Sequence, residues 1–163
     1  MYSMRTGHDE TDTNNKDKVM PSIFFTVPGE PVAKARPRGR VVSTLSGRQF
    51  VSMYTPKTTV NYENRVMAAF RGVYTGQPID TPVGMQIAAY FQIPQSVSQK
   101  RREAMAGQPV GKKPDIDNLI KSILDGLNTV AYTDDKLVCE LSITKRYSFN
   151  PRCEITINYE VKS

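Results

Sequence analysis

The stretch from Lys113 to Asn128 constrains the fold of this 163-residue chain more than any other feature. The proline near its start favours extended backbone, in which Asp115 and Asp117 point to one side while Ile116 points into the core. Asp117 suits the N-cap of a helix over residues 118–127. The apolar face of this helix consists of Leu119, Ile120, Ile123, Leu124 and Leu127. The stretch therefore predicts an extended entry into a helix that is packed on one side and acidic on the other.

Shorter apolar runs, separated by Pro, Gly and Asn, predict the remaining elements. Strands are expected over residues 23–27, 41–44, 49–54, 83–93, 137–145 and 153–161. Helices are expected from residue 56 to about 73, from Ser96 or Ser98 to about 106, and over residues 118–127. This order predicts an α+β fold with a mixed sheet flanked by a few helices. We expect one domain over residues 22–163 and a disordered polar tail over residues 1–21.

The composition narrows the chemistry and the partners. The net charge of +6 and the isoelectric point near 9.4 favour a polyanionic partner such as nucleic acid. No apolar run approaches the roughly 20 residues of a membrane helix and no leader opens the chain, so we expect a cytoplasmic protein without membrane contact. His8 is the only histidine, and Cys139 and Cys153 are expected to be reduced core thiols. Zinc and histidine-based nucleophilic chemistry are thereby excluded, which leaves carboxylates, lysine and a hard metal ion.

Acidic side chains gather around the predicted helix, which is unusual in a basic protein. Asp117, Lys121 and Asp125 fall at i, i+4 and i+8 and form one polar stripe. Asp134 and Asp135 follow the helix. Each part alone has an ordinary explanation, namely a helix cap, a solvated salt-bridge stripe or a turn. Together with the Asp-x-Asp pair before the helix, they favour a magnesium site, with manganese as a substitute, because clustered carboxylates repel one another unless a cation binds them.

Basic side chains form a second pattern. Four of them alternate along the extended segment 33–40, so all four are expected to face the same side, like a comb along a phosphate backbone. The alternative is a mobile basic loop without fixed geometry. Further cations flank the acidic stretch or end a predicted strand. The candidate DNA-binding residues are Lys34, Arg36, Arg38, Arg40, Lys112, Lys113 and Lys145.

The acidic stretch resembles the signature of the RusA Holliday junction resolvases of phages and prophages. It reads Lys-Pro-Asp-Ile-Asp-Asn-Leu-Ile-Lys over residues 113–121, Leu-Asp-Gly-Leu-Asn over residues 124–128, and then Asp-Asp at 134–135. The run Pro-Val-Ala-Lys-Ala-Arg-Pro-Arg over residues 31–38 is similar to the phage branch of that family. The resemblance extends over roughly residues 23–161.

This resemblance implies a homodimer that uses magnesium, and no small-molecule cofactor, to resolve four-way DNA junctions by paired symmetrical nicks. By position, Asp115, Asp117 and Asp135 match the essential carboxylates of the family, and Lys121 matches its essential lysine. Asp134, as a further metal ligand, and Asp125 match acidic positions of secondary importance, and Lys145 also has a counterpart. Two other functions stay open: a DNA-binding phage protein without catalysis, and a more general nuclease for branched DNA.

Overall fold

The computed structural model describes residues 20–162. The predicted tail over residues 1–21 falls almost entirely outside this range. The elements are β1 (Ser22–Pro28), β2 (Arg38–Ser43), β3 (Gln49–Tyr54), α1 (Lys57–Arg71), β4 (Val83–Gln92), α2 (Gln99–Met105), α3 (Ile116–Leu127), a short 3-10 turn η1 (Asp135–Leu137), β5 (Val138–Ser148) and β6 (Arg152–Tyr159).

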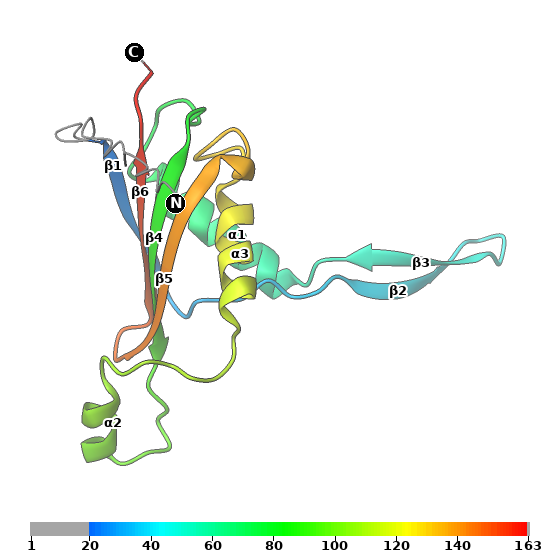
Figure 1. The fold of residues 1–163 in the computed structure, drawn as a ribbon. Helices are drawn as coiled ribbons and strands as arrows, with labels where there is room; N and C mark the ends of the chain where they lie inside the picture. The colour runs from blue at the N-terminus through cyan, green and yellow to red at the C-terminus, as the bar shows by residue number, and fades with distance from the viewer. Residues whose placement is uncertain (1–19, 163) are drawn as a thin grey trace, which may run out of the picture.

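A four-stranded mixed sheet forms the centre of the fold, in the order β1-β6-β4-β5 (Figure 1). β4 pairs in parallel with β5 and antiparallel with β6, and β6 pairs antiparallel with β1. Helices α1 and α3 pack against one face of this sheet. The predicted α+β class with a mixed sheet and a few helices is confirmed.

The core lies between the helices and the inner face of the sheet. Alternate residues of β1, β4 and β6 are buried, as expected for strands with one covered face. Helix α1 buries Thr59, Tyr62, Val66 and Phe70, and α3 buries Leu119, Ile123 and Leu127 together with two small residues. Val60 lies one position off the buried stripe and Val73 lies beyond the end of the helix, so both are exposed.

Helices α1 and α3 cross at very close range because Gly126 has no side chain. A β-carbon built on Gly126 would lie 2.9 Å from the backbone oxygen of Glu63 and 3.1 Å from Cβ of Val66. This close approach sets α3, and with it the acidic stretch, at a fixed depth against α1 and the sheet. Within residues 20–162, no helix is both long and apolar enough to cross a membrane.

Strand β5 lies at one edge of the sheet and differs from its prediction. It runs to Ser148, because its parallel pairing with β4 continues to the end of that strand. Lys145, the predicted last residue of the strand, and Arg146, predicted to follow it, therefore both lie inside the strand. Cys139 is exposed, which corrects the expectation of two core thiols, whereas Cys153 on β6 is buried. The difference arises because β5 is an edge strand, whereas β6 is central and its inner face is covered.

Strands β2 and β3 form a separate two-stranded ribbon that projects away from the body of the molecule (Figure 1). The turn between them includes Gly47, whose φ of 79° lies in the left-handed region that favours glycine. β2 begins at Arg38, three residues before the predicted start. The alternating basic segment is thus partly a paired strand.

Candidate functional site

The entry into α3 differs from the prediction by two residues. The helix begins at Ile116, and Asp115 is its N-cap residue with extended backbone (φ −70°, ψ 144°). Asp117 therefore lies in the first turn and is not the cap. Ile116 is 43 % exposed, so the expectation that it points into the core is wrong. Ile116 shares the helix face of the buried Ile123 and Leu127, but it is the first residue of the helix and lies one turn before the buried stripe begins at Leu119.

The structure brings four of the predicted site residues into one row along α3. Nζ of Lys121 lies 3.0 Å from Oδ1 of Asp125 and 3.9 Å from Oδ2 of Asp135. Asp117 is one turn before Lys121 on the same helix face. The Lys121 side chain is 55 % exposed and thus accessible to an anionic ligand. The predicted stripe is confirmed, and Asp135 joins it from the segment after the helix.

Asp134 and Asp135 are held by the turn η1. The Lys136 backbone N–H donates to the Asp134 carboxylate at 2.9 Å, and this contact holds the pKa of Asp134 below its usual value. Tyr132 is buried beneath the site, and its hydroxyl donates to the Leu124 carbonyl at 3.0 Å. Burial raises the pKa of Tyr132, and the carboxylates of Asp135 and Asp125 raise it further. The segment after α3 is therefore anchored to the helix at the level of the acidic row.

The oxygen donors needed for a hard cation are present. The carboxylates of Asp115 and Asp117 are exposed and make no ion pair or hydrogen bond with any residue in the described range 20–162. Asp135 lies 3.9 Å from the Lys121 ammonium and beside the Asp134 carboxyl group. Over the same range, no three His, Cys, Asp or Glu side chains already stand together as a ligand group. By donor chemistry Asp115, Asp117 and Asp135 fit magnesium, which binds few carboxylates and keeps several waters.

Lys34 occupies a place that the sequence did not indicate. Its ammonium contacts the Glu63 carboxylate and lies 3.0 Å from Oδ2 of Asp125. Burial by itself would lower the pKa of Lys34, but the hydrogen bonds to the two carboxylates outweigh it and hold the pKa above 10.5. The expectation that Lys34 faces the same side as the three arginines after it is wrong. Two acidic partners on different helices draw its side chain inward.

Glu63 is the site residue whose role sequence reasoning missed. It lies on α1 beside the buried stripe formed by Thr59, Tyr62 and Val66, and its side chain is only 20 % exposed. An acid at the margin of a buried helix face needs a cationic partner. The position of Glu63 therefore indicates that it has a cationic partner. The sequence does not identify that partner, Lys34, because it lies 29 residues away.

Backbone contacts fix Lys34 beside α3. The Lys34 N–H donates to the Asn118 carbonyl at 2.8 Å. The buried Ser122 hydroxyl donates to the Val32 carbonyl at 2.7 Å. The Ala35 N–H donates to Oγ1 of Thr59 on α1 at 3.2 Å. Residues 32–35 are thus joined to both helices, and the chain leaves this point toward β2.

Lys145 supports the loop that leads to Asp115. Its Nζ donates to the carbonyls of Lys112 and Pro114, each at 2.6 Å. The side chain, predicted to contact DNA, is thus engaged with the protein backbone. A second backbone pairing, from the Val110 N–H to the Lys145 carbonyl at 3.0 Å, ties the same loop to the edge of β5. Lys112 and Lys113, which were predicted to contact DNA, are exposed in the same loop.

The remaining predicted DNA-binding residues, Arg36, Arg38 and Arg40, are all exposed. They lie on the chain segment that runs from the helices into the projecting ribbon. The positive surface therefore begins next to the acidic row and continues outward along β2.

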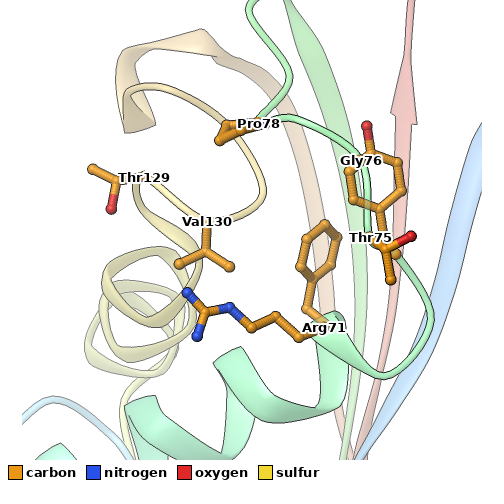
Figure 2. A pocket seen from close by; sticks show the side chains of 8 residues that line it. Arg71, Thr75, Gly76, Pro78, Thr129 and Val130 are labelled. Atoms are coloured by element: carbon orange, nitrogen blue, oxygen red, sulfur yellow. The ribbon is translucent and has the colours of Figure 1, made fainter.

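A pocket elsewhere on the molecule does not belong to this site. It lies where the loop after α1 meets the loop after α3 (Figure 2). Its lining contains one charged side chain and no carboxylate. The lining residues are Phe70, Arg71, Tyr74, Thr75, Gly76, Pro78, Thr129 and Val130. The acidic row is instead an open surface, as a site for a large polyanion requires.

Comparison with known proteins shows the family to which this chain belongs. The profile of the endodeoxyribonuclease RusA family matches residues 28–158, which is most of the chain. The chain belongs to the RusA family of DNA endonucleases. It is also 39 % identical over 144 residues to the uncharacterized protein YqaN of Bacillus subtilis (strain 168), covering 85 % of this chain and 96 % of that protein. The RusA match extends from the end of β1 to β6 and includes the whole acidic row.

Proposed function

We propose that this RusA-family protein is a magnesium-dependent endonuclease that resolves four-way DNA junctions by paired symmetrical nicks. The observation that carries the proposal is the exposed row of Asp117, Lys121, Asp125 and Asp135 in a basic member of a DNA endonuclease family. A DNA-binding surface without catalysis has no use for carboxylates that repel phosphate beside its cations.

Asp115, Asp117 and Asp135 are the residues that would hold the metal ion, with Asp134 as a further oxygen donor. Bound there, magnesium supplies a Lewis acid for the scissile phosphate and lowers the pKa of a coordinated water. The protein keeps these carboxylates exposed and, for Asp115 and Asp117, free of partners in the described range.

Lys121 and Asp125 form the second part of the site. The exposed Lys121 ammonium can approach a phosphate oxygen and neutralise the negative charge that develops on the leaving oxygen. Asp125 holds Lys121 at 3.0 Å and is itself held by Lys34 on its other oxygen. Asp125 is therefore a positioning residue, whereas Lys121 acts on the substrate.

Two nicks on opposed strands need two such sites. Within residues 20–162 the chain has one acidic row, so we propose a homodimer whose two-fold axis coincides with that of the junction. The second nick then follows at high local concentration. On a supercoiled plasmid with an extruded cruciform, the parent should give linear product directly. Mixed dimers of parent and Asp117→Asn chains should give nicked circles, and equal linear yield from mixed dimers would contradict paired action.

The direct test incubates the protein with four-way junction, three-way junction, flap and linear duplex in magnesium. We expect paired symmetrical nicks in the four-way junction alone, and none without a divalent cation. Equal cutting of all branched substrates would indicate a general branched-DNA nuclease. Junction binding without cutting, in magnesium or manganese, would indicate a DNA-binding protein and would refute the proposal.

A further inference from the structure

The projecting ribbon β2–β3 carries an unusual charge. Between Glu30 and Glu63 the sequence has no acidic residue and six basic ones: Lys34, Arg36, Arg38, Arg40, Arg48 and Lys57. All except Lys34 are exposed. Because the segment contains no acidic residue of its own, its positive charge is not neutralised locally and attracts a polyanion.

The strand register divides the ribbon into two different faces. Residues directly opposite each other in an antiparallel pair share a face, and successive pairs alternate between faces. Arg38 pairs with Tyr54 and Arg40 with Ser52, so these four residues lie on one face. The next pair on this face is Val42 with Phe50. We call it the arginine face.

The other face is largely apolar. It is formed by the pairs Gly39–Met53 and Val41–Val51, with the polar pair Ser43–Gln49 at the end next to the turn. A β-carbon built on Gly39 would lie 3.0 Å from Val51 and 3.6 Å from the Met53 sulfur, which confirms that these residues share a side. This apolar face carries no charge, so the positive charge of the paired strands is confined to the arginine face.

A two-stranded ribbon is only marginally stable in water and gains stability from a surface that covers it. The side chains of the arginine face indicate which kind of partner surface would cover the ribbon. Guanidinium groups bind phosphates and base edges bidentately, and an exposed aromatic ring such as that of Tyr54 adds apolar contact area. Nucleic acid matches this combination.

The width of the ribbon determines which groove of duplex DNA can accept it. Strands of six residues extend over about 20 Å, and two paired strands with their side chains are roughly 10 Å wide. The major groove of duplex DNA is about 12 Å wide and admits a two-stranded ribbon, whereas the minor groove, at about 6 Å, does not. The ribbon therefore fits one groove and not the other.

The base of the ribbon lies at the acidic site. The Lys34 N–H is bonded to α3 at Asn118, and the Ala35 N–H to α1 at Thr59. The first arginine of the ribbon is only three residues further on. A duplex that received the ribbon would therefore lie beside α3 with its backbone near the carboxylates.

We propose that β2–β3 is an arm that enters the major groove of one duplex arm of the DNA substrate, with Arg38 and Arg40 directed at base edges and phosphates. This inference rests on the proposed function for the identity of the substrate. It adds a second contact outside the cleavage site. Since Arg reads guanine through O6 and N7, the arm contributes to the sequence preference of cleavage.

The test is protection of guanine N7 from dimethyl sulfate, because N7 lies in the major groove. Parent protein bound to a four-way junction in calcium, without cleavage, should protect guanines in the duplex arms. The double variant Arg38→Gln/Arg40→Gln should lose this protection and bind about 10-fold or more weakly. The matched control Val41→Thr/Val51→Thr changes the opposite face and keeps β-branched residues, so it should protect as the parent does.

Two results would contradict the proposal that the ribbon enters the major groove. Undiminished N7 protection by the arginine variant would show that the ribbon does not enter the groove. Loss of binding and of dimerisation in the valine variant alone would show that the ribbon docks on a second copy of the chain. These outcomes are independent of cleavage. A protein that protects N7 through the arm but never nicks keeps this inference and refutes the proposed activity, while nicking without arm-dependent protection does the reverse.

Discussion

Replacement of Lys34 by methionine should destabilise the fold in a manner that depends on pH. The substitution keeps the apolar stem of the side chain and removes the ammonium that contacts Glu63 and lies 3.0 Å from Asp125. Each hydrogen bond to a charged group contributes about 1.5–3 kcal/mol when buried. These side chains are 20–23 % exposed, so solvent reduces the contribution. We expect a loss of about 2 kcal/mol in the free energy of unfolding at pH 7.

The pH dependence follows from two pKa shifts with opposite signs. Burial alone would raise the pKa of Asp125, but hydrogen bonds from Lys34 and Lys121 outweigh it and hold this pKa below 3.8. A depressed carboxyl pKa gives stability that is present above the unfolded value and lost as the pH falls through the folded value. The raised pKa of Lys34 gives stability that is present below 10.5 and lost as the pH rises through the folded value. The difference between parent and variant should therefore be greatest between about pH 5 and 10 and shrink toward pH 3.

Urea unfolding followed by circular dichroism measures this difference. A loss of about 2 kcal/mol corresponds to a midpoint lowered by roughly 1 M urea for a domain of this size. The control is Arg36→Met, which removes a nearby exposed cation and should change the midpoint far less. A Lys34→Met midpoint equal to that of Arg36→Met at pH 7, or a difference that stays constant down to pH 3, would refute the reasoning.

Three further predictions concern α3. Asp117→Asn should abolish cleavage and leave junction binding intact or tighter, because it removes a metal ligand and a negative charge near phosphate; cleavage and mobility-shift assays measure both effects. Lys121→Ala should lower the single-turnover rate by about 10²-fold with unchanged junction affinity, whereas an unchanged rate would reduce Lys121 to an ion-pair partner of Asp125. Gly126→Ala should lower the free energy of unfolding by about 1–3 kcal/mol in urea unfolding, because its β-carbon would lie 2.9 Å from the Glu63 backbone oxygen and push α1 and α3 apart.

The elements with strong local signals could be predicted from the sequence. β4 alternates fully buried residues with less buried ones over its whole length, and α3 has an apolar stripe that ends near Gly126 and Asn128, so both elements could be placed within two residues. The start of α3 was misplaced because Asp115 and Asp117 are equally good cap residues, and sequence does not show which one has extended backbone. The end of β5 was misplaced because its last residues pair with β4, a contact between strands more than 40 residues apart.

In the candidate site too, features that depend on local spacing could be predicted, whereas contacts between residues distant in the sequence could not. The Asp117–Lys121–Asp125 stripe follows from helical spacing alone, and the structure reproduces it. The place of Lys34 does not follow from spacing, because a lysine in an alternating basic run has the same local pattern whether it faces solvent or an acid. Only the folded chain brings Glu63 and Asp125 to it.

The position of Lys34 beside Asp125 affects the distribution of charge in the acidic row. Asp125 has two carboxylate oxygens, one beside Lys34 and one beside Lys121, so its charge is shared between a half-buried and an exposed cation. Because Lys34 already neutralises part of the charge on Asp125, Lys121 keeps more of its positive potential for a phosphate than it would in an isolated pair. The lysine that the sequence assigned to DNA contact thus lies behind the proposed catalytic site, while the arginines that follow it in the same segment remain exposed.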